Sequence, residues 1–262
     1  MPSIDLSDIL CLHYEEVNPD GSPPVLLLHG LGSVGADWQS QFAALAQAGY
    51  RVLAPDLRGF GRSSAPPEVS IQAMAQDMAL FLERVEAVPA HVVGLSLGGT
   101  VALQLALDHP EMVRRLALVN TLARLRFPSL GDRLYFLARA ILTRFLGPER
   151  QAEMVARRLF PRPEQQALRE GIIRRISQTN PYAYRSAMRS LLQFDVTARL
   201  SELRMPVLVV TGAEDTTIPM PVQQTLAQGI PGARHVVVEK SGHGIIVDNP
   251  DAFNRILLEF LG

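Results

Sequence analysis

The chain has 262 residues, 47% of them hydrophobic, and a formal net charge of −1 at pH 7. This length and composition fit one large α/β domain with a substantial buried core, with or without an insertion. No apolar run reaches the roughly 18 residues that span a membrane, and the single cysteine, Cys11, excludes an internal disulfide framework and a cysteine-rich metal site. The N-terminus lacks a basic segment followed by an apolar stretch, so we expect no signal peptide and a cytoplasmic protein.

Strands alternate with helices along the first 120 residues. Short apolar runs predict strands, because a strand that is covered on both faces in a parallel sheet is continuously hydrophobic. Longer segments with apolar residues three and four positions apart predict amphipathic helices. The expected strands span 4–6, 9–14, 25–28, 50–54, 91–93 and 116–120, and the expected helices span 38–48, 70–86 and 100–107.

This alternation stops after residue 120 and resumes near residue 206. The segment between shows helical patterns and no convincing strand, and its prolines divide it into roughly four helices. Strands at 206–212 and 235–239 and helices from residue 221 and over 250–261 complete the chain. We therefore predict a mostly parallel, doubly wound sheet, with a core of 1–120 and 205–262 and a helical insertion at 121–204.

The insertion is strongly basic. Residues 121–204 hold 16 arginines against 7 acidic residues, a net charge of +9, whereas the rest of the chain carries −10. The arginines recur at helical spacings without interleaved aromatic residues, which argues against a nucleic-acid-binding surface. Two interpretations remain, a solvated arginine-rich helix surface and a field that attracts an anionic substrate, and we favour the first.

One short stretch has the pattern of a catalytic turn. The sequence Gly94-Leu95-Ser96-Leu97-Gly98 joins a predicted strand to a predicted helix, and G-x-S-x-G in that context is a nucleophile elbow. The glycines leave room where strand and helix nearly touch. The turn would aim the start of the helix at a developing oxyanion. A glycine-rich turn with no catalytic role would have the same pattern, so residues elsewhere in the chain are needed to distinguish the two interpretations.

A serine nucleophile needs a base and a group that orients the base. His243 lies between two glycines in the loop after the last predicted strand, and we predict that it is the general base. The loop after the preceding strand offers Glu214 and Asp215, which spacing alone hardly separates, and we choose Asp215. The predicted catalytic residues are therefore Ser96, Asp215 and His243.

Two backbone N–H groups are the expected oxyanion-hole donors. One belongs to Leu97, beside the serine, and the other to Leu31, in a loop where flanking glycines allow close approach to a ligand. His29 in the same loop is expected to fix its shape through hydrogen bonds rather than to react. The chain shows no zinc-binding helix motif, phosphate loop or dinucleotide fingerprint, so we predict no metal and no cofactor.

Apolar and aromatic residues near these loops and in the insertion are candidates for an acyl pocket, although core packing would explain them equally well. The candidates are Trp38, Leu95, Phe127, Tyr135, Phe136 and Phe145.

Five motifs, in order along nearly the whole chain, resemble the α/β-hydrolase superfamily. They are His29-Gly30-x-Gly32, Asp56-x-Arg58-Gly59-x-Gly61-x-Ser63, Gly94-x-Ser96-x-Gly98-Gly99, Gly212-x-x-Asp215-x-x-x-Pro219 and Gly242-His243-(x)₄-Asp248-x-Pro250. The resemblance implies the α/β-hydrolase fold, favours Asp215 over Glu214, and implies that the insertion is a cap over the active site. It looks closest to small carboxylesterases and 3-oxoadipate enol-lactonases.

We therefore predict a serine hydrolase (a carboxylic ester hydrolase, EC 3.1.1) that cleaves a small-molecule ester or lactone through an acyl-enzyme. A cofactor-free perhydrolase similar to haloperoxidases, or an aminopeptidase, would use the same three residues. A non-enzymatic alternative is a ligand receptor on a hydrolase scaffold, and the complete set of catalytic residues argues against it.

Overall fold

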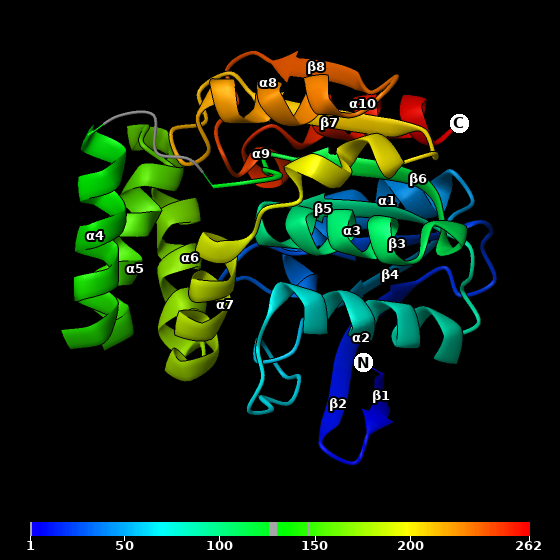
Figure 1. Cartoon of the computed structure of the whole chain (residues 1–262), viewed down its shortest axis with the longest axis horizontal. Coiled ribbons are helices and arrows are strands. Elements are labelled where there is room, and N and C mark those ends of the chain that lie inside the picture. Colours follow the sequence, from blue (N-terminus) through cyan, green and yellow to red (C-terminus); the bar gives the residue numbers. More distant parts are fainter. Residues whose placement is uncertain (1, 126–129, 146) are drawn as a thin grey trace.

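One eight-stranded sheet organises the chain in the order β1-β2-β4-β3-β5-β6-β7-β8 (Figure 1). The structure is a computed structural model, and it describes residues 2–125, 130–145 and 147–262. The strands are β1 (Ser3–Ser7), β2 (Leu10–Val17), β3 (Pro24–Leu28), β4 (Arg51–Pro55), β5 (Ala90–Leu95), β6 (Val113–Val119), β7 (Val207–Gly212) and β8 (Arg234–Val238). β2 pairs antiparallel with β1 and β4, and the other pairs are parallel. The predicted mostly parallel sheet is confirmed.

Helices cover both faces of this sheet (Figure 1). α2, α3 and α8 pack on one face, whereas α1 and α10 pack on the other. These helices are α1 (Gln39–Gln47), α2 (Ile71–Arg84), α3 (Leu97–Asp108), α8 (Met220–Gly229) and α10 (Pro250–Leu261), with short helical turns at η1 (Gly35–Trp38), η2 (Pro110–Met112), η3 (Pro163–Gln165), η4 (Thr197–Glu202) and α9 (Ile245–Asp248).

The apolar run of β3 shows why its sequence folds this way. Leu26 and Leu28 belong to the core beneath α2 and α3, and Val25 and Leu27 belong to the core beneath α1 and α10. All four side chains are fully buried. Because successive side chains of a strand point to opposite faces, a continuous apolar run is what a doubly covered strand needs.

Besides the short turns η3 and η4, the described residues between β6 and β7 form four α-helices: α4 (Leu130–Phe145), α5 (Gly147–Leu159), α6 (Gln166–Gln178) and α7 (Pro181–Gln193). Figure 1 shows them side by side at one end of the sheet. Apart from an isolated bridge between Arg124 and Asp195, the described part of this segment contains no strand. In the described ranges, no helix has both the length and the apolar character needed to cross a bilayer.

Candidate active site

The turn at Ser96 has the strained geometry of a nucleophile elbow. Ser96 has φ 53° and ψ −114°, a conformation that residues with a Cβ seldom adopt. Its N–H donates to the Val119 carbonyl at 2.9 Å, and its carbonyl accepts from the Thr121 hydroxyl at 2.7 Å. A Cβ on Gly94 would lie 2.3 Å from the Gly98 carbonyl oxygen, so the first glycine of the motif is a steric requirement of this turn.

His243 and Asp215 form a buried pair at the ends of β8 and β7. The His243 Nδ1 and Asp215 Oδ2 atoms are 2.9 Å apart. The other oxygen of Asp215 accepts the backbone N–H groups of Thr217 at 2.8 Å and Ile218 at 3.0 Å, which fixes the carboxylate. Because an ionised carboxylate only accepts, Nδ1 of His243 donates and Nε2 keeps a free lone pair. Glu214 instead pairs with Arg162 at 3.6 Å.

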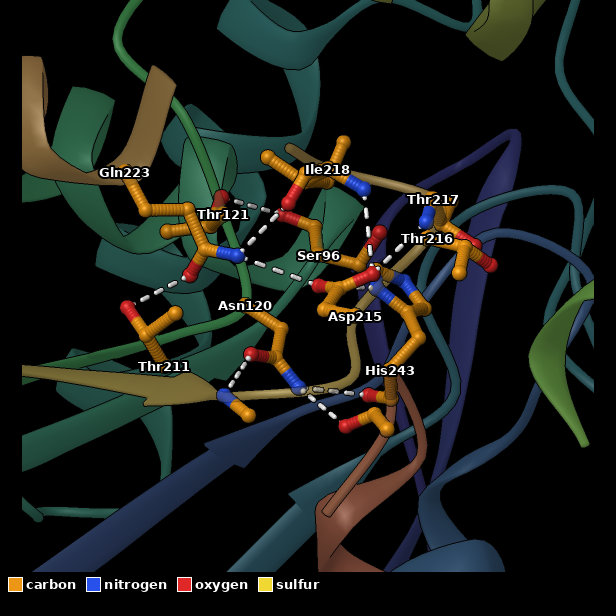
Figure 2. A network of polar contacts seen from close by, with 12 residues as sticks. Ser96, Asn120, Thr121, Thr211, Asp215, Thr216, Thr217, Ile218, Gln223 and His243 are labelled. Carbon is orange, nitrogen blue, oxygen red and sulfur yellow. Dashed lines mark hydrogen bonds and ion pairs between the residues drawn. The ribbon is translucent and has the colours of Figure 1, made fainter. Parts of the chain in front are cut away.

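A glutamine that the sequence analysis missed supports the carboxylate from α8. Gln223 is fully buried, and its Nε2 donates to Asp215 Oδ2 at 3.1 Å. Its Oε1 accepts the Thr211 hydroxyl at 2.9 Å. Figure 2 shows the resulting series of contacts from Thr211 through Gln223 and Asp215 to His243. A glutamine within an ordinary helix gives no local sequence signal for this contact.

The contacts of Asn120, directly after β6, were not predicted either, and this residue ties three segments together behind the site (Figure 2). Its Nδ2 donates to the carbonyls of Gly242 at 3.0 Å and His243 at 2.8 Å, and its Oδ1 accepts the Gly212 N–H at 2.8 Å. The side chain is fully buried, and its φ is 44°. Asn120 therefore holds the loop of His243 against the end of β7.

Asp248 holds the same loop from the other side. Its Oδ2 accepts the Gly242 N–H at 2.9 Å. Burial raises the pKa of this carboxyl above its ordinary value, although the Gly242 N–H and the charge of Arg162 oppose that shift. The residue thus positions the backbone next to His243 at the cost of a partly buried charge.

His29 fixes the predicted oxyanion loop, in agreement with the expectation from the sequence. Its Nε2 accepts the Leu57 N–H at 2.9 Å, so Nδ1 carries the proton and donates to the Gly30 carbonyl at 2.8 Å. Burial lowers the pKa of His29, which keeps the ring neutral. A Cβ on Gly30 would lie 3.6 Å from the Ser96 Cβ, so this loop stands directly beside the elbow.

A cavity of about 520 Å³ lies between the strand ends and the inserted helices. Ser96, His243, Leu31 and Leu95 line it together with residues of α4, α5, α6 and α7. Its described lining also includes Gly30, Ser33, Asp37, Gln39, Arg139, Val155, Leu159, Phe160, Ala167, Leu168, Gly171, Ile172, Arg174, Arg175, Gln178, Leu191, Thr217, Ile218, Gly244, Ile246 and Val247. The volume is that of a small-molecule site.

The prediction that Trp38 lines this pocket is wrong. Trp38 is fully buried in the core beneath α1 and α10, where its ring centroid lies 6.1 Å from that of Phe253. It is the last residue of the short turn η1, directly before α1 begins.

Tyr135 also lies outside the described cavity lining. The Arg158 guanidinium carbon stands 3.9 Å from the centroid of its ring. Phe127 lies outside the described residues, as do the side chains of Phe136 and Phe145. Within the described part of the chain, no group of three or more histidine, cysteine, aspartate and glutamate side chains could hold a metal ion.

Comparison with known sequences gives one consistent result. The family model described as alpha/beta hydrolase fold matches residues 23–250. A protein of Variovorax paradoxus (strain S110) named "Putative carbamate hydrolase RutD" is 35% identical over 261 residues, covering 95% of this chain and 96% of its own length. A protein of the same name from Caulobacter vibrioides is 36% identical, with 95% of each chain covered.

Solved structures agree with the sequence matches. The enol-lactonase from Burkholderia xenovorans LB400 superposes with a TM-score of 0.89 at 28% identity and covers 99% of both chains. A thermophilic esterase from Thermogutta terrifontis superposes with a TM-score of 0.84 at 28% identity, covering 96% of this chain and 93% of that one.

Proposed function

The chain belongs to the alpha/beta hydrolase fold family, and on this basis we propose that it is a serine hydrolase that cleaves a carboxylic ester or lactone. One observation carries the proposal: Ser96, in a strained elbow, shares a cavity with His243, which is held by Asp215. These residues supply the nucleophile, the general base and the orienting acid of a serine triad. A ligand receptor on the same scaffold would not need all three.

In the first half of the reaction, Ser96 is acylated. Nε2 of His243 removes the proton of the Ser96 hydroxyl as Oγ attacks the substrate carbonyl. Asp215 holds the ring in the tautomer that leaves Nε2 free and stabilises the imidazolium that forms. The tetrahedral intermediate then collapses, and His243 returns its proton to the departing alkoxide.

The intermediate carries negative charge on the former carbonyl oxygen. We assign its stabilisation to the backbone N–H groups of Leu97 and Leu31. Leu97 begins α3, where the first N–H groups have no partner within the helix. Leu31 belongs to the loop that His29 holds beside Ser96. Loss of one such donor costs about 10²–10³ in turnover in comparable sites.

In the second half, water releases the acyl group. His243 takes a proton from water, the hydroxide adds to the acyl carbonyl, and Ser96 Oγ leaves with the proton from His243. The segment 121–204 acts as the cap in this proposal, since residues of its helices line the cavity. A cap of this kind excludes bulk water and selects the acyl group.

Hydrolysis of a carbamate is the second candidate, because the RutD relatives carry that name. The same residues would attack the carbamate carbonyl. The cavity of about 520 Å³ lies in the size range of pockets for larger small molecules, so it has room for substrates beyond a free carbamate ion. Perhydrolase and aminopeptidase activities remain alternatives that use the same triad.

The test is turnover of a p-nitrophenyl ester series from acetate to octanoate, with an enol-lactone alongside. We expect hydrolysis by the native protein and a loss of at least ~10³-fold in Ser96→Ala. Ethyl acetate and ethyl carbamate, which differ by a methyl and an amino group, separate ester from carbamate preference. Full esterase activity in Ser96→Ala would refute the proposal.

A further inference from the structure

Three arginines and one acid line the cavity beside Ser96. Arg139 comes from α4, Arg174 and Arg175 come from α6, and Asp37 comes from η1. The three arginines and the one acid leave a surplus of two positive charges in the described lining. Arg175 and Arg139 each have a polar partner in the fold, whereas Arg174 has none among the described residues.

Arg175 is neutralised by Asp37. Its Nε donates to Asp37 Oδ1 at 3.1 Å. The other oxygen of Asp37 accepts the Ser33 hydroxyl at 2.5 Å and the Val34 N–H at 3.2 Å. Both oxygens of the only acid in the described lining are therefore engaged, and this ion pair joins the cap to the loop after β3.

Arg139 is a buried cation in the wall of the cavity. Its guanidinium donates to the Tyr184 hydroxyl and lies 5.6 Å from the centroid of the Tyr184 ring. Tyr184 also abuts the oxyanion loop, since a Cβ on Gly32 would lie 3.0 Å from its ring. Arg139 thus adds positive potential close to the site, where water screens it poorly.

Arg174 differs from both, because it lines the cavity and is exposed to solvent. Among the described residues, none forms an ion pair or a hydrogen bond with it. Gln178 lies one turn later on the same helix and also lines the cavity. Leu168 and Ile172 make the same lining apolar elsewhere along α6. In its described lining, the cavity therefore combines apolar walls with one exposed arginine that has no polar partner among the described residues.

We infer that Arg174 selects substrates whose acyl group carries a carboxylate, separated from the reacting carbonyl by an apolar segment. The inference rests on the proposed function for the identity of the reacting bond, but the anion site itself does not. A guanidinium binds a carboxylate through two parallel hydrogen bonds. The one exposed arginine of the described lining suits a monoanion, and the apolar walls accommodate the chain that links the carboxylate to the ester.

The kinetic test compares mono-p-nitrophenyl glutarate with its methyl ester, which has the same acyl chain without the charge. In Arg174→Gln, kcat/KM for the anionic ester should fall about 3- to 10-fold through KM, while the neutral ester changes less than about 2-fold. Arg185→Gln is the matched control, because Arg185 is an exposed arginine of α7 outside the described lining. It should change neither substrate. An equal effect of Arg174→Gln on both esters would overturn the inference.

A binding test separates this inference from the proposed function. Isothermal titration calorimetry measures the binding of glutarate to the Ser96→Ala variant and to the variant that combines Ser96→Ala with Arg174→Gln. We expect glutarate to bind the Ser96→Ala variant. Its affinity should be about 3- to 10-fold weaker when Arg174→Gln is added, and also when 0.5 M NaCl is added. Binding that depends on Arg174 without any ester hydrolysis would refute the hydrolase function alone. Ester hydrolysis with glutarate binding that is absent or independent of Arg174 would refute the anion site alone.

Discussion

Replacing Asn120 by alanine should damage both stability and turnover. The side chain is fully buried and makes three hydrogen bonds, to the Gly212 N–H and to the carbonyls of Gly242 and His243. Each buried polar group left without a partner costs about 1–3 kcal/mol. Three such groups amount to at least about 3 kcal/mol. The positive φ of 44°, which asparagine tolerates better than alanine, acts in the same direction.

Urea unfolding followed by circular dichroism measures this loss, and the ester assay measures turnover. We expect kcat to fall about 10-fold with little change in KM, because the His243 loop loses its anchor while the cavity walls stay in place. Asn254→Ala is the matched control. It removes hydrogen bonds of similar length, 2.9 and 3.0 Å, at a less buried position, and should cost about 1 kcal/mol or less. A loss below about 1 kcal/mol in Asn120→Ala with normal turnover would refute this reasoning.

Three further substitutions test the elbow, the acid and the loop. Gly94→Ala should lower the free energy of unfolding by at least about 3 kcal/mol, because its Cβ would overlap the start of α3. A Cβ on Gly171 would have no atom within 4 Å, so Gly171→Ala should instead stabilise the helix and the protein. Equal urea midpoints for the two variants would contradict both predictions. Gln223→Leu should lower kcat about 3- to 10-fold at unchanged KM, since Asp215 loses a partner, and a change in KM alone would speak against this. Asp248→Asn keeps a hydrogen-bond acceptor and removes a carboxyl whose pKa is raised by burial. The stability of this variant relative to the native protein should therefore increase as the pH rises from about 4 to 7.5. A stability difference that does not depend on pH would contradict this prediction.

Local patterns sufficed to predict the sheet and to place the loops of Ser96, Asp215 and His243 at one edge of it. The apolar run of β3 and the glycines around Ser96 each reflect a requirement within a few residues of themselves. Because parallel strands end at the same edge, the loops of Asp215 and His243 could be placed near each other without any contact information. The pair at 2.9 Å agrees with that placement.

Contacts between distant elements could not be predicted in this way. The ion pair of Arg175 and Asp37 joins residues 138 positions apart, and either one alone resembles a solvated charge. Trp38 was one of the candidates for the acyl pocket. Its ring packs instead in the core beneath α1 and α10, against Phe253, which lies more than 200 residues later in the sequence. Such details depend on how the layers pack, and no local spacing encodes them.

The most direct test of the central claim is covalent labelling with diisopropyl fluorophosphate. An activated serine attacks the phosphorus, fluoride leaves, and the product is identified by mass spectrometry of the digested protein. We predict one diisopropylphosphoryl group on the peptide that contains Ser96, with labelling at least ~100-fold slower in His243→Ala. An unlabelled Ser96 in the folded native protein, or a label on a different serine, would contradict the account.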